Sequence, residues 1–118
     1  MKALKISTDD EISVVDVEQP IHESMRAIIG GWIEIVRPRG LPHPYCMVVD
    51  EEGLLHDKPM NYVGSVLYKT HTHGSPIVGD IVIMREDRGP EGYDLFGLSV
   101  ADIEDLTQNL GDILKLKV

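Results

Sequence analysis

Short apolar segments, each bounded by proline, glycine or acidic turn residues, make up most of this sequence. Apolar and polar residues alternate over residues 2–6 and 11–17, with a period typical of half-buried strands. The polar stretch Thr8–Asp10 separates them, and aspartate favours turns because its side chain bonds to nearby backbone. The two segments therefore predict a β-hairpin at the start of the chain.

Strand patterns recur further along the chain, over residues 32–36, 44–49 and 81–84. The first is rich in β-branched and aromatic residues, and the proline-rich stretch 37–42 separates it from the second. The third is apolar throughout, which is typical of a central strand. The turn 50–53 leads into Leu54–Leu55 and predicts a second hairpin, whereas the charged stretch 85–92, with its Gly and Pro, predicts a loop.

Helical periodicity predicts two helices. The segment after Pro20 has one apolar face, formed by Ile21, Met25, Ile28 and Ile29. Gly30–Gly31 would end this helix, because glycine adopts the left-handed conformation without a Cβ clash. The second helix begins at Ser99, whose spacing to Asp102 is that of a capping box, and continues as an amphipathic helix to residue 110.

Residues 57–67 fit two interpretations. Asp57 could cap a short helix, since Pro59 is tolerated in a first helical turn. Val63, Val66 and Tyr68 would equally suit a strand. The pattern leaves helix and strand open for this segment.

These elements predict an α+β fold: one compact domain over residues 1–118, with a mixed or mostly antiparallel sheet of about five strands and two or three short helices packed on it. The simplest arrangement places the two clear helices on one face of the sheet. With 118 residues and 42% hydrophobic content, the chain can bury a core without disulfides. The only cysteine, Cys46, lies in an apolar run and is expected to be a buried thiol in a cytosolic protein.

The chain is acidic, with a formal net charge of −9. Binding of duplex nucleic acid depends on clustered Lys and Arg and is therefore not expected. No apolar run approaches the roughly 20 residues that span a bilayer, and the N-terminus lacks the apolar core of a signal peptide, so neither membrane insertion nor export is expected. The acidity suits either a basic partner protein or an ordinary soluble surface.

Catalytic motifs are weak in this sequence, and no enzyme activity or cofactor is expected. His71 and His73 would point to the same side of a strand and could share a metal ion, but no third ligand stands at a metal-motif spacing. Glu51 and Glu52 lie in a turn, where solvation keeps carboxylates from acid–base work. The glycines form no phosphate-binding loop.

Four motifs, in this order and spacing, carry a family resemblance: GGWIEIV at 30–36, DEEGLL at 50–55, KPMN at 58–61 and IVGDIV at 77–82. Together they resemble a family of small uncharacterised domains carried mainly by bacteriophages of Gram-positive hosts and related mobile elements. The resemblance spans most of the chain and implies a phage accessory protein in the cytosol of an infected bacterium. The chain departs from the pattern in longer loops at 37–44 and 71–74, which are expected to carry what is particular to this member.

Two classes of function are compatible with these patterns. The first is a non-enzymatic protein that binds and modulates a host protein, such as a defence or nucleic-acid enzyme, through its acidic surface. The second is a small-molecule binder, for example of a nucleotide-like signal, working between the protomers of a homodimer. A metal-dependent enzyme using His71, His73 and Glu51 or Glu52 ranks last.

The candidate binding residues are Trp32, Arg37, Arg39, Glu51, Glu52, Asn61 and Tyr62. Several of them have a structural alternative. Asn61 beside Pro59 would more often fix a turn or cap a helix, and Trp32 at the start of a β-rich run would more often belong to the core. Arg37 and Arg39 would more often belong to a solvated loop.

Overall fold

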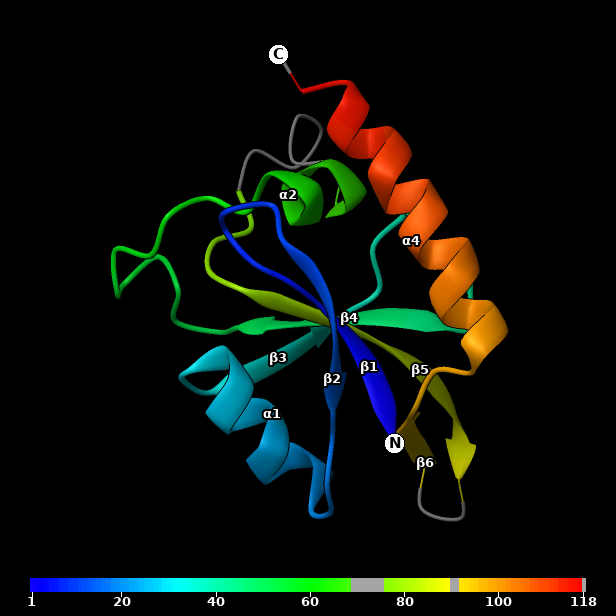
Figure 1. Cartoon of the computed structure of the whole chain (residues 1–118). Helices are drawn as coiled ribbons and strands as arrows, with labels where there is room; N and C mark the ends of the chain where they lie inside the picture. The colour runs from blue at the N-terminus through cyan, green and yellow to red at the C-terminus, as the bar shows by residue number, and fades with distance from the viewer. Residues whose placement is uncertain (69–75, 90–91, 118) are drawn as a thin grey trace.

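A six-stranded antiparallel sheet forms the middle layer of the molecule (Figure 1). The computed structural model describes residues 1–68, 76–89 and 92–117. The strands are β1 (Lys2–Ile6), β2 (Ile12–Asp16), β3 (Ile33–Val36), β4 (Tyr45–Asp50), β5 (Ile81–Gly89) and β6 (Gly92–Phe96). Five of them follow the order β2-β1-β5-β4-β3, and β6 pairs with β5. The predicted α+β class and the first hairpin, β1 with β2, are confirmed.

Strand β5 is the centre of the sheet, as the apolar run at its start predicts. Its first half pairs with β1, where Leu4 lies opposite Ile83, and its other edge pairs with β4. Its second half pairs with β6, from Arg85 opposite Phe96 to Gly89 opposite Gly92. The prediction of a loop over residues 85–92 is therefore wrong, because the charged residues of this stretch continue the strand and pair across a hairpin.

Helices cover both faces of the sheet, which corrects the expectation of one covered face. The helix α1 (Ile21–Ile29) packs on one face, and α2 (Tyr62–Tyr68) and α4 (Val100–Lys115) pack on the other (Figure 1). The reason lies in the central strands, which are apolar on both sides. In β4, Cys46 and Val48 face the α1 layer, whereas Met47 and Val49 face the α2 and α4 layer.

The connection between β4 and α2 lacks the predicted second hairpin, and of the two interpretations of residues 57–67 the helix is correct from Tyr62 on. Residues 51–57 form turns rather than a second hairpin, and Leu54–Leu55 start no strand. Asp57 has φ of +52°, a left-handed conformation that does not cap a helix. The helix begins at Tyr62, because Asn61 accepts a hydrogen bond from the Gly64 N–H at 2.9 Å and so occupies the capping position.

The helix ends follow the local signals in the sequence. Gly30 closes α1 at φ of +83°, and its N–H donates to the Arg26 carbonyl at 2.8 Å. Ser99 and Asp102 form the predicted capping box at the start of α4: the Asp102 N–H donates to Ser99 Oγ at 3.1 Å, and the Ser99 N–H donates to Asp102 Oδ2 at 2.9 Å. Both predictions are confirmed.

Replacing Ser99 by alanine is expected to lower the free energy of unfolding by about 1 kcal/mol, because the Asp102 N–H loses its acceptor. For a domain of this size the corresponding fall in melting temperature is about 4 °C. Thermal unfolding followed by circular dichroism measures it. Thr107→Ala, at an exposed position within the same helix, is the control and should change stability by less than about 0.5 kcal/mol. Equal losses in the two variants would show that the cap contributes nothing of its own.

Cys46 is fully buried and behaves as a core residue. Burial, with a smaller contribution from the nearby Glu86 carboxylate, raises the pKa of its thiol to about 12. The thiol is therefore protonated at neutral pH, and the prediction of a buried structural cysteine is confirmed.

Candidate binding surfaces

A buried ion pair brings three of the sequence motifs together at one end of the sheet. Asp50 ends β4, its side chain has no solvent exposure, and it pairs with the ammonium group of Lys58. The same Lys58 Nζ donates to the Ile29 carbonyl at the end of α1, at 3.0 Å. A Cβ on Gly31 would lie 3.0 Å from Asp50 Oδ2, so the chain passes the carboxylate closely only because this residue is glycine.

Hydrogen bonds stabilise the negative charge of the buried Asp50 carboxylate. Burial acts to raise the pKa of its carboxyl, but hydrogen bonds from Lys58 and from the Glu52 N–H, the latter 2.8 Å long, outweigh burial and lower it. His56 Nδ1 lies 3.5 Å from Asp50 Oδ2 and adds a weaker contact. Asp50 is therefore an anion at neutral pH that ties residues 52, 56 and 58 to the end of β4.

The connection held by this ion pair presents apolar side chains to solvent. Leu54 is 61% exposed, Leu55 is 80% exposed and Met60 is 53% exposed. Trp32, which precedes β3, is 58% exposed, and its carbonyl accepts a hydrogen bond from the Glu51 N–H at 2.9 Å. We call this region the acidic apolar end; it consists of Trp32, Leu54, Leu55, Met60, Glu34, Glu51, Glu52 and Asp57.

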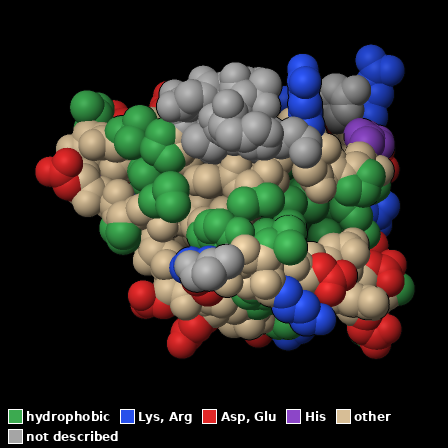
Figure 2. Space-filling view, turned by 90° about the horizontal axis from the view of Figure 1, so that it is seen from above, with side chains coloured by type: hydrophobic (Ala, Val, Ile, Leu, Met, Phe, Trp, Pro, Cys, Tyr) green, Lys and Arg blue, Asp and Glu red, His purple; other side chains and the backbone are tan. Residues whose placement is uncertain are grey.

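Two parts of the acidic apolar end, the turn around Gly53 and the Met60 segment, lie side by side. Met60 bridges to Val78, and a Cβ on Gly53 would lie 2.5 Å from Val78 Cγ2, so the turn and the Met60 segment pack on the same residue. Glu34, Glu51 and Asp57 are exposed. Hydrophobic side chains, with acidic ones among and beside them, lie at the left of Figure 2, on the side where Figure 1 shows the β4–α2 connection.

Trp32 is on the surface, so the alternative interpretation of this residue as part of the core is wrong. The Arg26 guanidinium of α1 lies 3.7 Å from the centroid of the indole ring. Such a cation–π contact holds the ring in one orientation and covers one of its faces. Trp32 is thus a fixed aromatic surface next to the carboxylates.

The remaining predicted binding residues lie elsewhere. Arg37 follows β3 at the opposite end from Trp32, roughly 17 Å along the strand, and forms a two-point ion pair with Glu86. Arg39 is exposed in the 37–44 loop. Tyr62 is half-buried at the start of α2, with Lys117 Nζ 5.3 Å from its ring centroid.

Asn61 is fully buried, and its amide is committed to backbone. Besides capping α2, its Nδ2 donates to the Ile6 and Gly79 carbonyls, each at 3.0 Å. The side chain therefore joins β1, the start of α2 and the segment before β5. Asn61 was predicted either to bind a ligand or to fix a turn or cap a helix, and the geometry fits the helix cap.

His71 and His73 lie outside the described residues. Within residues 1–68, 76–89 and 92–117, no group of three or more His, Cys, Asp and Glu side chains is placed to hold a metal ion. Among the same residues, no helix combines the length and the apolar composition that spanning a membrane requires.

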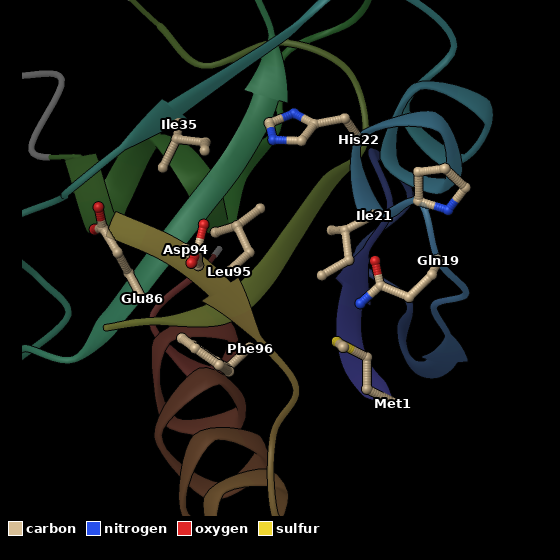
Figure 3. A pocket seen from close by; sticks show the side chains of 10 residues that line it. Met1, Gln19, Ile21, His22, Ile35, Glu86, Asp94, Leu95 and Phe96 are labelled. Atoms are coloured by element: carbon tan, nitrogen blue, oxygen red, sulfur yellow. The ribbon is translucent and has the colours of Figure 1, made fainter. Parts of the chain in front are cut away.

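A second candidate surface is a cavity of about 430 Å³ on the α1 side of the sheet (Figure 3). The first turn of α1 and the residues before it form one wall, and β6 with parts of β3 and β5 forms the other. Its lining residues are Met1, Gln19, Pro20, Ile21, His22, Ile35, Glu86, Asp94, Leu95 and Phe96. None of them is among the binding residues predicted from the sequence. They belong to segments far apart in the chain, and a sequence pattern does not show that such segments meet.

Leu54 and Leu55 were also missed by sequence reasoning, which assigned them to a strand. One feature of the sequence did argue against a strand. The pair stands between the acidic turn 50–53 and Pro59, which leaves few residues for a strand that could pair with the preceding one. Glu86 carried no such signal, since charged residues in a predicted loop are ordinarily solvated.

The fold is that of a small α+β domain, and the two surfaces described above are its candidate binding surfaces. Residues 1–110 match the model of the family described as Domain of unknown function (DUF3846), so the chain belongs to that family. The motif resemblance to an uncharacterised family is confirmed at this level.

One solved structure shares the fold. The crystal structure of small RNA methyltransferase HEN1 is similar with a TM-score of 0.54 and 14% sequence identity, over 91% of this chain and 16% of that chain. This chain thus spans a small part of the longer protein, and at this identity the likeness concerns the fold alone. No curated protein sequence matches the chain.

Proposed function

We propose that this chain is a non-enzymatic accessory protein, encoded by a phage or mobile element, that binds and modulates a protein of the bacterial host in the cytosol. The acidic apolar end is the contact surface. The observation that carries the proposal is the exposure of Trp32, Leu54 and Leu55, between 58% and 80%, beside exposed carboxylates. Exposed apolar groups gathered on one surface are typical of interaction sites.

The composition of this end favours a protein partner with a basic rim. Trp is the residue most enriched at the energetic centre of protein interfaces, and Leu54 and Leu55 supply apolar area around it. Glu34, Glu51 and Asp57 are exposed there, and the chain as a whole carries a net charge of −9. Such a surface attracts a positively charged partner and increases its association rate.

The end is also preorganised, which favours binding. The Asp50–Lys58 ion pair holds the base of the connection, and Arg26 holds the Trp32 ring. A surface already held in position loses less conformational freedom when it binds.

A photo-crosslinking residue placed at position 55 tests the proposal. We expect illumination in a lysate of the bacterial host to link position 55 to a basic protein, with the yield falling steeply as salt is raised from about 0.05 M to about 0.5 M. The matched control is position 100, because Val100 is 73% exposed and lies at the start of α4, away from the connection. Mass spectrometry identifies the linked proteins.

Charge variants at the same end separate the acidic contribution from the apolar one. Glu51→Lys with Glu52→Lys should reduce the yield of the position-55 crosslink about tenfold, whereas Glu104→Lys, on the exposed face of α4, should leave it unchanged. The proposal would be contradicted by equal crosslinking from positions 55 and 100, or by crosslinks that ignore the charge reversal.

A further inference from the structure

Strand β3 stands at one end of the strand order, so one of its two edges has no strand beside it. Within the described part of the chain, β3 pairs with β4 alone. The Glu51 N–H donates to the Trp32 carbonyl at 2.9 Å, and hydrogen-bonded positions alternate along an antiparallel ladder, so Trp32 and Glu34 bond to β4. The N–H and C=O groups of Ile33 and Ile35 therefore point away from β4.

These four outward backbone groups are a template for a further strand. The ladder leaves them without a strand partner among the described residues. An edge of unpaired N–H and C=O groups is the feature to which an extended segment of another chain adds. Antiparallel addition would form four backbone hydrogen bonds, two at Ile33 and two at Ile35, and would break none of the existing ones.

Helix α1 lies beside β3 on one face of the sheet (Figure 1). His22, in its first turn, and Ile35 of β3 line the same cavity of about 430 Å³ (Figure 3). One helical turn further on, Arg26 lies over the Trp32 ring, and these two residues line a hollow of about 280 Å³ together with Gly31. The outer edge of β3 thus has an opening beside α1 at each of its ends.

The side chains of β3 specify what an added strand should carry. Residues opposite Ile33 and Ile35 would point to the α1 face, where Ile21 and Leu95 line the cavity with Ile35. The residue between them would lie opposite Glu34 on the other face. Glu34 is exposed, and its carboxylate has no ion pair with any described residue, so it favours a basic neighbour. The complementary segment is therefore apolar, basic and apolar in turn.

The other outer strand, β2, has an unpaired edge without these additions. The Val17 N–H donates to the Met1 carbonyl at 2.8 Å, so by the same alternation the outward positions of β2 are Ile12, Val14 and Asp16. No residue of β2 lines either of the two openings beside α1. Strand β2 is therefore an internal comparison for β3.

We propose that the outer edge of β3 binds an extended segment of the partner protein, with an apolar–basic–apolar pattern, which adds to the sheet as an antiparallel strand. The inference rests on the proposed protein contact, because Trp32 and Glu34 belong to the acidic apolar end, and it specifies how that end is bound. The backbone bonds supply affinity, whereas Glu34 and the cavity beside Ile35 select the side chains.

Hydrogen exchange of backbone amides, measured by NMR with the peptide acetyl-Thr-Ile-Lys-Ile-Thr-amide, tests the proposal. In the free chain the N–H groups of Ile33 and Ile35 should exchange quickly, whereas that of Glu34 is already protected by β4. Saturating peptide should slow exchange at Ile33 and Ile35 about tenfold and leave Ile12 and Val14 of β2 unchanged. The same peptide with both isoleucines N-methylated lacks the two donors and should protect neither position.

A charge exchange tests the role of Glu34. The wild type should bind the lysine peptide about fivefold more tightly than the same peptide with glutamate in the middle. The variant Glu34→Lys should reverse this order, whereas the control Glu104→Lys, on α4, should keep it. Glu34 is exposed, so the fold should persist in the variant, and its amide spectrum verifies this.

The proposal is overturned if the peptide leaves Ile33 and Ile35 unprotected, if it protects β2 equally, if the N-methylated peptide binds as well, or if Glu34→Lys keeps the lysine preference. Protection that grows with protein concentration in the absence of peptide would also overturn it, and would assign this edge to a second copy of the chain. The peptide test needs no host protein. Its failure is therefore distinguishable from a failure of the position-55 crosslink.

Discussion

Replacing Lys58 by methionine is expected to lower the free energy of unfolding by about 3 kcal/mol at neutral pH. Methionine keeps the length of the side chain but removes the ammonium group, which leaves the Asp50 carboxylate without solvent and without its main partner. The Ile29 carbonyl also loses its donor. Because Lys58 itself is 23% exposed, water reaches part of the site, and the expected loss is at the lower end for a broken buried pair.

The effect of this variant should depend on pH with a defined sign. In the wild type the pKa of Asp50 is lowered, so its stabilisation is complete above the unfolded value of about 3.9 and is lost as the pH falls through the folded value. Without Lys58, burial dominates and should raise the pKa of Asp50 above the unfolded value. The difference in stability between the variant and the wild type should therefore be largest at neutral pH. It should begin to shrink as the pH falls through the raised pKa of the variant, above the unfolded value, and continue to shrink down to the lowered pKa of the wild type.

Urea unfolding between neutral and acidic pH measures this difference. The control is Lys115→Met, which removes a lysine that lies 3.5 Å from Asp112 and is 80% exposed; it should change stability by less than about 0.5 kcal/mol at every pH. A Lys58→Met loss as small as that of the control, or one that grows on acidification, would show that the ion pair does not hold this end of the sheet.

Replacing Asn61 by alanine is expected to cost about 4 kcal/mol. The change removes the Asn61 hydrogen bonds of three backbone groups: the Gly64 N–H and the Ile6 and Gly79 carbonyls. Each buried unsatisfied group costs about 1–3 kcal/mol, and relaxation around the truncated side chain recovers part of the sum. The melting temperature should fall by more than about 10 °C.

The nearly isosteric variant Asn61→Asp separates the capping role from the donor role. Its carboxylate still accepts from the Gly64 N–H but turns an oxygen toward the Ile6 and Gly79 carbonyls, so it should be as destabilising as alanine at neutral pH. Protonation at low pH restores one donor and should recover part of the loss. Asn109→Ala, on an exposed turn of α4, is the control. Near-neutral stability of both Asn61 variants would mean that the three-way contact is unimportant.

Local signals predicted the parts of the fold that depend on a few consecutive residues. Four features are of this kind: the first hairpin, the glycine end of α1, the central apolar strand and the Ser99 capping box. Each depends on side chains that influence the backbone within a few residues of themselves. The same reasoning was wrong for Leu54–Leu55, because whether an apolar pair starts a strand depends on a partner strand, and β4 already pairs with β3 and β5.

The candidate surfaces were predicted only in part. Trp32, Glu51 and Glu52 do gather at one end, whereas Arg37 lies at the other end of β3 and Asn61 is in the interior. Residues that share a motif need not share a surface, since strand direction alone can carry them roughly 17 Å apart.

The sequence by itself determined where the first hairpin, α1, α4 and the apolar start of β5 form, that the core needs no disulfide, and that the molecule carries excess negative charge, because these properties belong to single residues and short periods. Only the tertiary structure decided that helices cover both faces, that Gly31 passes close to the buried ion pair of Asp50 and Lys58, and that the start of α1 and strand β6 line a cavity. These features require segments distant in sequence to pack against one another, and packing depends on the order and direction of strands in the whole sheet.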